Sequence, residues 1–335
     1  MRNSKKDFAL FIVNNLSSLA SMLNRRHIRI KVLQNLYAIQ KNQSDAIDVQ
    51  EKFLIASMEN MKDLYLMMLS TLIEIQKTEQ EYLDLASQKH LATYEERNPN
   101  RKFVNNAVLQ ILVNSDSLNN NIEERGVDYF KIHNNYITHL IKEIKSSDFY
   151  LKYMSNKEQS FKDDQNFIID VYKNIIAPDE KIYDFIEDSK ITWLDDVPVI
   201  NTSIVKQLST LRNENDYFKV SRVFKNEDDK EFAIQLFRKT ILNFNELAKQ
   251  YEDKTNNWEI DRIAELDAIM LNMGICELTK FPSIPVKVSI NEYLEIAKEY
   301  STPKSSIFIN GILDVLVKEM KENNTLNKIG RGLIE

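Results

Sequence analysis

The chain has 335 residues, a formal net charge of −6 and only five glycines. Dinucleotide-binding folds, P-loop proteins and α/β-hydrolases need glycines at fixed spacings, and none of their signatures occurs here. One cysteine and four histidines, without zinc-ligand spacing, exclude a disulfide framework and a cysteine-based zinc site. No nucleophile–base pair stands out, so neither enzymatic activity nor a cofactor is predicted. A single thiol in a chain of this size is typical of a reducing, cytoplasmic location.

Positive charge is concentrated at the N-terminal end. Residues 1–44 contain eight bases and one acid, a net charge of +7, so the rest of the chain is strongly acidic. A basic arm on an acidic body is typical of a protein that touches nucleic acid at one place, and a solvated basic terminus is the alternative. The apolar run within residues 1–21 is too short for a membrane span. We expect residues 1–21 to be a disordered leader, or to precede a native start at Met22.

Helical periodicity dominates the remaining chain and predicts an all-α protein. Residues 28–39 carry apolar stripes on two sides, which predicts a helix at the centre of a bundle, with Asn24 as its N-cap. Further helical patterns follow at residues 46–89, 104–119, 127–146, 163–176, 179–189, 201–212, 229–253, 258–280, 286–300 and 303–322. Turn-forming residues predict breaks at residues 98–100, 119–121, 178, 198, 226–229 and 282–285.

Two segments of the chain resemble each other. Residues 164–193 match residues 229–258 without a gap, and the chain's two tryptophans, Trp193 and Trp258, fall in register. The match predicts a duplicated helical module. Coincidence between two amphipathic helices is the alternative.

The first turns of the helix after Asn24 favour a bound anion. Arg25, Arg26 and Arg29 crowd a helix N-terminus, where the macrodipole disfavours positive charge. A phosphate group would offset that cost, because arginine forks and free helix N–H groups both bind phosphate. An exposed basic turn without a partner is the alternative.

A second place of this kind lies at residues 300–308. Thr302 suits an N-cap and Pro303 the first helical position, so that Lys304 and two serine hydroxyls would surround a helix start. Tyr300 and Phe308 could stack on nucleic-acid bases there. A well-capped helix with Phe308 in the core explains the same pattern.

Several strings resemble the NusB family of transcription antitermination factors. Residues 25–37 form an arginine-rich turn followed by a helix ending in Gln-x-Leu-Tyr, as in the opening of that family. Residues 285–292 read Pro-x-x-Val-x-Ile-Asn-Glu, and residues 308–314 read Phe-x-Asn-Gly-x-Leu-Asp. The resemblance covers residues 22–43 and 230–319, and typical members of the family are less than half as long as this chain.

The resemblance implies an all-helical fold of two packed bundles, without catalytic activity or a cofactor. Members of the family bind the boxA element of ribosomal RNA leaders as a heterodimer with the ribosomal protein NusE. The heterodimer then joins an antitermination complex on RNA polymerase, so no membrane partner is expected. On this reading we expect a NusB-like domain at residues 22–79 and 230–322, a helical insertion at 80–229 and a tail at 323–335.

The resemblance also implies individual roles. Asp267 falls where the family carries an acidic residue that faces NusE. His27 replaces a usual arginine or lysine, and Asn272 replaces a common arginine of the helix on the NusE side. The positions that match RNA-contacting regions are Arg25, Arg26, His27, Arg29, Lys298, Tyr300, Lys304, Ser305 and Phe308.

Two other functions fit parts of the same sequence. Ribosomal RNA cytosine methyltransferases carry a similar helical domain, but they also need a glycine-containing cofactor domain and a catalytic cysteine, which this chain lacks. A helical scaffold that does not bind RNA is the second alternative.

Overall fold

The structure is a computed structural model that describes residues 21–42, 46–158, 160–255 and 264–334. Within these ranges all regular elements are helical, apart from one isolated parallel bridge between Ser21 and Arg222, so the all-α prediction is confirmed for them. The chain divides into two compact units. Unit 1 comprises residues 59–223 with Ser21 and Met22, and unit 2 comprises residues 23–58 and 224–335. The expected leader, except Ser21, lies outside the described residues.

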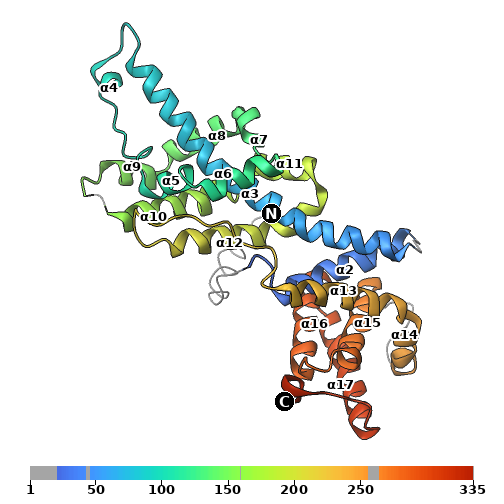
Figure 1. The fold of residues 1–335 in the computed structure, drawn as a ribbon. Helices are drawn as coiled ribbons and strands as arrows, with labels where there is room; N and C mark the ends of the chain where they lie inside the picture. Colours follow the sequence, from blue (N-terminus) through green and yellow to red (C-terminus); the bar gives the residue numbers. More distant parts are fainter. Residues whose placement is uncertain (1–20, 43–45, 159, 256–263, 335) are drawn as a thin grey trace. The chain divides into compact units, whose positions relative to one another are not determined.

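Unit 2 is built around α15 (Glu265–Lys280), in which residues 269–278 are all buried. A Cβ on Gly274 would lie 3.4 Å from the side chains of Tyr293 and Leu313, so a residue larger than alanine would push neighbouring helices away. The helices that contact α15 are α2 (Arg25–Asn42), α13 (Glu227–Leu242), α14 (Phe244–Glu252), α16 (Val286–Tyr300) and α17 (Ser305–Glu322) (Figure 1).

Helix α2 occupies the buried position that its two apolar stripes predict. Ile28, Val32 and Leu36 are buried on one side, and Ile30 and Leu33 are buried on the other. Contacts with α13, α15 and α16 cover these sides. The first turn of α2 is therefore held by three neighbouring helices.

The C-terminal tail packs onto unit 2. It contains the short 3₁₀-helix Gly330–Leu333. The Ile329 N–H donates to the Pro282 carbonyl over 3.0 Å, and the Lys328 ammonium donates to the Phe281 carbonyl over 3.1 Å. A Cβ on Gly332 would lie 1.9 Å from the Pro282 oxygen, so this approach requires glycine.

Unit 1 contains the longer part of α3 (Ile47–Ser87), a helix of 41 residues that Figure 1 shows in blue to cyan. The boundary between the units, at Glu59, lies within this helix. The other elements of unit 1 are α4 (Tyr94–Arg97), α5 (Ala107–Val113), α6 (Asp116–Arg125), α7 (Tyr129–Ile132), α8 (Asn134–Ser146), α9 (Asp148–Ser155), α10 (Phe161–Val171), the π-helix Tyr172–Ile176, α11 (Glu180–Ser189), the 3₁₀-helix Ile191–Asp196 and α12 (Val197–Thr210).

Several predicted helix boundaries were wrong, and at one of them a short polar side chain caps a helix inside an apolar pattern. The pattern at 104–119 is divided, since the Ser115 hydroxyl accepts the Leu118 N–H and starts α6. The predicted break at 119–121 lies inside α6. Pro198 does not break α12 but stands in its first turn, where a missing N–H is tolerated. The pattern at 229–253 is likewise divided, at Asn243.

The two segments of the predicted repeat fold alike. Each consists of a helix, a second helix and a 3₁₀-turn. In the first segment these are α10 with its π-helix, α11 and residues 191–196. In the second segment they are α13, α14 and η3 (Asp253–Thr255). Trp193 is fully buried and its indole N–H donates to the Asn60 carbonyl over 3.0 Å. Trp258 lies outside the described residues, and the duplication stays a prediction.

The boundaries of the compact units differ from the domain boundaries that the sequence suggested. Residues 59–79, assigned to the NusB-like domain, belong to unit 1, and unit 2 resumes at residue 224 instead of 230. A compact unit is defined by packing, whereas the sequence boundaries followed a resemblance. The assignment of residues 80–229 as an insertion therefore stays a prediction.

Candidate functional site

The first turn of α2 is capped as the sequence predicts. The Asn24 side-chain oxygen accepts the His27 N–H over 3.0 Å, and the Asn24 carbonyl accepts the Ile28 N–H over 3.1 Å. In return, His27 Nδ1 accepts the Asn24 N–H over 3.5 Å. This reciprocal arrangement is that of a capping box, with histidine in the place of the usual glutamate or glutamine.

Burial lowers the pKa of His27 to about 4, and the charges of Arg26 and Lys31 act in the same direction. Acceptance of the Asn24 N–H also favours the neutral ring, because a protonated Nδ1 cannot accept. At neutral pH His27 therefore carries no positive charge. It can offer a single N–H to a ligand, but not the charge that an arginine or lysine would supply.

This histidine predicts a pH dependence of stability. The pKa of His27 is about 4 in the folded chain and 6.5 as the ordinary value, so the unfolded chain takes up the proton first as the pH falls. Folded-state stability should therefore decrease from about pH 6.5 down to about pH 4. A His27→Gln variant keeps an acceptor at the capping position and should lose this part of the dependence. Urea unfolding of both proteins across that range measures it, and identical pH profiles would refute it.

Arg25 lies on the surface of unit 2, with its side chain 42 % exposed, and is held by two contacts. Its Nε donates to the Asp229 carboxylate over 2.9 Å. Its guanidinium also stacks over the Phe232 ring, 4.4 Å from the centroid. Both partners come from the first turns of α13, so this helix fixes the direction of Arg25.

Arg26 faces α16. Its Nε and Nη2 donate to the two carboxylate oxygens of Glu292 over 3.1 and 2.9 Å. This hydrogen-bonded pair raises the pKa of Arg26, and the charges of Glu295 and Glu299 raise it further. Glu292, Glu295 and Glu299 share one face of α16 by their spacing of three and four residues.

Arg29 is placed in the core, and its expected role in RNA binding stays a prediction. Its residue exposure is 1 %, and its Nε and Nη2 donate to Glu277 over 2.8 and 2.6 Å. Its Nη1 donates to the Arg25 carbonyl over 3.1 Å, so the buried guanidinium supports the turn that carries Arg25. Although burial lowers the pKa of Arg29, the Glu277 carboxylate outweighs it and the pKa is raised.

Glu277 completes a buried polar cluster under the turn. Besides Arg29, its carboxylate accepts the Ser289 hydroxyl over 2.7 Å and the Tyr293 hydroxyl over 3.2 Å. Four donors thus converge on one buried carboxylate, which offsets its desolvation. The cluster ties α2 to α15 and α16.

The second predicted region, at the end of α16 and the start of α17, divides into exposed and buried parts. Lys298 and Lys304 are exposed, and Tyr300 is half-buried. Lys298 pairs with Glu295 over 2.6 Å, and Glu295 also experiences the charge of Arg26. The charges of Arg26 and Lys298 therefore both act on the same carboxylate, which links the two predicted regions electrostatically on unit 2.

Ser305, Phe308 and Asp267 are buried, with exposures of 3, 5 and 5 %. The Ser305 hydroxyl is hydrogen-bonded to those of Ser301 and Thr302, each over 2.9 Å. The Ser301 hydroxyl in turn donates to the Asp267 carboxylate over 2.6 Å. Asp267 and Ser305 fix the turn between α16 and α17 from inside, and Phe308 belongs to the core. Their expected roles in binding NusE or RNA stay predictions. Helix α17 begins at Ser305, after the expected cap.

Asn272 is fully buried in α15, and neither of its side-chain amide atoms has a hydrogen-bond partner in the part of the chain that the structure describes. Its side chain is therefore enclosed within unit 2, and a partner contact of this helix stays a prediction.

The sequence reasoning missed the acidic partners of the arginines. Asp229 stands in a predicted break, Glu292 ends a family motif, and the sequence gives Glu277 no role. A signal was present in the charges: three arginines at one helix N-terminus need nearby carboxylates if the helix is to be stable without a ligand.

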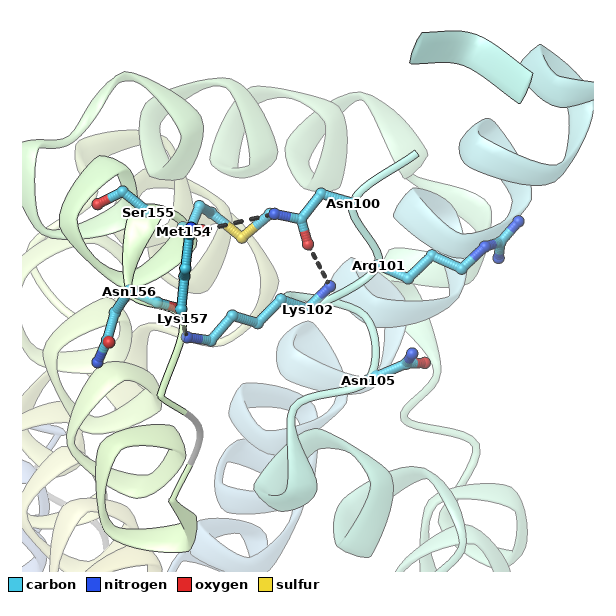
Figure 2. A pocket seen from close by; sticks show the side chains of 8 residues that line it. All are labelled: Asn100, Arg101, Lys102, Asn105, Met154, Ser155, Asn156 and Lys157. Atoms are coloured by element: carbon cyan, nitrogen blue, oxygen red, sulfur yellow. Dashed lines mark hydrogen bonds between the residues drawn. The ribbon is translucent and has the colours of Figure 1, made fainter. Parts of the chain in front are cut away.

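A polar pocket in unit 1, of about 430 Å³, is lined by cations but is not a convergent site. Lys102 donates to the carbonyls of Asn156 and Glu158 over 2.7 and 3.3 Å, closing the end of α9. Arg101 pairs with Asp84 over 2.6 Å, and Figure 2 shows its side chain pointing away from Lys157. Lys102 and Arg101 therefore bind other parts of this unit.

Other chemistry finds no support in the described residues. Among them, no group of three or more histidine, cysteine or acidic side chains is arranged to hold a metal ion. Burial raises the pKa of the Cys276 thiol to about 11, which makes it a poor nucleophile. None of the described helices has the length and apolar character that crossing a membrane requires.

Part of this sequence is similar to proteins of a known family. The sequence model of the NusB family matches residues 199–318, from within α12 to α17. The transcription antitermination protein NusB of Finegoldia magna is 38 % identical over 120 residues, which are 35 % of this chain and 87 % of that protein. The chain belongs to the NusB family.

Two further relatives carry the same name. NusB of Salinibacter ruber is 46 % identical over 105 residues, or 31 % of this chain and 66 % of that protein. NusB of Chloroherpeton thalassium is 41 % identical over 106 residues, which are 32 % of this chain and 50 % of that protein. The chain thus spans two thirds or less of the length of these two relatives. No solved structure matches it. Because the family match begins at residue 199, part of the expected insertion is similar to the family.

Proposed function

We propose that this NusB-family chain is an RNA-binding transcription antitermination factor. It would bind boxA-type leader RNA together with the ribosomal protein NusE, within an antitermination complex on RNA polymerase, and would have no catalytic role. The observation that carries the proposal is the pair of surface arginines at the N-terminus of α2, Arg25 and Arg26, held in fixed directions by α13 and α16. Relatives named for antitermination support the choice of process.

The proposed RNA surface is smaller than the sequence suggested. Arg25 and Arg26 would contact phosphates, and Lys298 and Lys304 would extend the positively charged surface along the bound RNA strand. Tyr300 would offer a partly exposed ring to a base. Arg29, Ser305 and Phe308 are buried and would act indirectly, by holding the exposed residues of this surface in place.

The carboxylates beside the arginines favour the second candidate, a helical scaffold that does not bind RNA. On that hypothesis, Arg25 and Arg26 serve to tie α2 to α13 and α16 through Asp229 and Glu292. The two functions make opposite predictions for Asp229→Asn. An RNA-binding arginine released from its carboxylate should bind phosphate at least as well, whereas a scaffold should only lose stability.

The central test is binding of a boxA-type single-stranded RNA, with and without NusE, across a salt series. The variant is Arg25→Ala/Arg26→Ala, which spares the buried Arg29. Losing two phosphate contacts on a single strand should flatten the log–log salt slope by about 1.4. The matched control is Arg238→Ala/Lys239→Ala, which removes two bases of α13 in the same unit and should leave the slope unchanged.

Three outcomes separate the candidates. Loss of affinity in the Arg25/Arg26 variant alone, with Asp229→Asn binding at least as well as the unmodified chain, supports the RNA function. Equal losses of RNA affinity in the Arg25/Arg26 variant and in the control indicate nonspecific electrostatic binding. No RNA binding by the folded, unmodified protein in either condition rejects the RNA function and leaves the scaffold.

A further inference from the structure

The segment between α12 and α13 exposes an aromatic ring that packing in unit 1 does not explain. Tyr217 is 82 % exposed, more than any other aromatic side chain that the structure describes. It stands in an irregular stretch, residues 211–223, which we call the Tyr217 loop. An exposed aromatic ring on an anchored backbone is available to stack on a ligand without first leaving a packed position.

The backbone on both sides of Tyr217 is anchored. On one side, the Arg212 N–H donates to the Asp216 carboxylate over 2.5 Å. On the other, Phe218 is buried at 1 % exposure and its carbonyl accepts the Ser115 hydroxyl over 2.9 Å. The next carbonyl, of Lys219, accepts the Gln207 side-chain amide. The loop therefore presents Tyr217 without needing to order itself first, which reduces the entropy lost on binding.

Exposed positive side chains stand before and after Tyr217 in the sequence of the loop. Burial alternates along the segment: Tyr217 and Lys219 are exposed, and Phe218 between them is buried. Alternation places Tyr217 and Lys219 on the same side of an extended backbone. Arg212 and Arg222 are also exposed, and the acids of the loop are Glu214 and Asp216.

An exposed ring flanked by cations matches single-stranded nucleic acid. Each base offers a face for stacking, and phosphates on either side of it meet the cations. A protein partner would instead require apolar neighbours around the ring, as in the buried centre of an interface. Of the apolar residues in the loop, Leu211, Phe218 and Val223 are buried and Val220 is half-buried.

We propose that the Tyr217 loop is a second RNA-binding surface, in which Tyr217 stacks on a base while Lys219 and Arg222 contact phosphates. The choice of RNA as the ligand rests on the proposed antitermination function. The loop belongs to unit 1, and the residues changed to test it, Tyr217 and Lys219, are not those changed to test the arginine-rich turn, so the two surfaces can be tested independently.

The test uses the full chain and a boxA-type RNA extended on both sides by uridines. In Tyr217→Ala/Lys219→Ala, the loss of stacking should weaken binding about tenfold. The loss of one phosphate contact should flatten the salt slope by about 0.7. The matched control is Tyr183→Ala/Lys181→Ala in α11 of the same unit, where Tyr183 is 46 % exposed; its affinity should not change. Circular dichroism melting should show both variants folded, because all four side chains lie largely outside the core.

The results for this loop and for the arginine-rich turn are distinguishable. If the unmodified chain binds and the Tyr217/Lys219 variant binds equally well, the loop proposal is overturned and the antitermination function stands. If the Arg25/Arg26 variant retains binding that the loop variant loses, the loop is the main RNA site. A folded chain that binds neither the extended RNA nor an unrelated single strand overturns both.

Discussion

Replacing Glu277 by alanine is expected to lower the free energy of unfolding by about 3–5 kcal/mol, because a buried arginine loses its main carboxylate and keeps only a longer contact of 3.5 Å with Glu292. Arg29 has an exposure of 1 % and donates twice to this carboxylate, so water cannot replace the lost acceptor. The hydroxyls of Ser289 and Tyr293 lose the same acceptor. Urea unfolding followed by circular dichroism measures the change.

The control for Glu277→Ala is Glu295→Ala, the same substitution at a carboxylate of the same unit. Glu295 pairs with Lys298, and both side chains are about half exposed, so this change should lower stability by less than about 1 kcal/mol. Similar effects for the two variants would contradict a central role of the buried pair. Partly folded Glu277→Ala should also bind RNA more weakly, since Arg29 holds the Arg25 carbonyl.

Trp193→Ala is expected to have a comparably large effect, about 3–5 kcal/mol, through a cavity in unit 1. Trp193 is fully buried, and its indole N–H is bonded to the Asn60 carbonyl of α3. Hydrogen exchange should show the loss of protection in peptides from α3 and from residues 180–210, which surround the cavity. Tyr217→Ala removes a large ring that is 82 % exposed and is the control. Unchanged protection around Trp193 would contradict the packing described here.

These stability experiments also bear on function. If unit 2 carries the arginine-rich site by itself, Trp193→Ala should retain the part of RNA binding that depends on Arg25 and Arg26. Binding that disappears together with the protection of unit 1 would instead assign the main contacts to unit 1. The role of residues 80–229 can be approached in this way without truncating the chain.

The sequence predicted the cations of the candidate site better than it predicted their surroundings. Arg25 and Arg26 stand at a capped helix N-terminus, as the pattern after Asn24 indicates. Arg29 follows them by one turn and has the same chemistry, yet the structure places it in the core. Its burial depends on Glu277, which is 248 residues away in the chain. A pairing at that separation leaves no local periodicity to detect.

The start of α17 shows the same limit. Spacing alone allowed Phe308 to be either a stacking ring or a core residue, and Ser305 to be either a phosphate ligand or part of a cap. Packing against the rest of unit 2 decided for the core and the cap, because Asp267 on α15 provides an acceptor for Ser301. Helix boundaries failed for a related reason, since single residues such as Ser115 override an apolar pattern.

What the sequence determined by itself was the helical class, the capped arginine-rich turn and the resemblance to the NusB family, because these depend on residues close together in the chain. Only the tertiary structure decided which charged residues reach the surface. Burial of an arginine depends on whether a carboxylate and hydroxyl donors from distant helices converge on it, as Glu277 and its neighbours do around Arg29. The same physical reason separates Arg25, which can meet a ligand, from Arg29, which holds it in position.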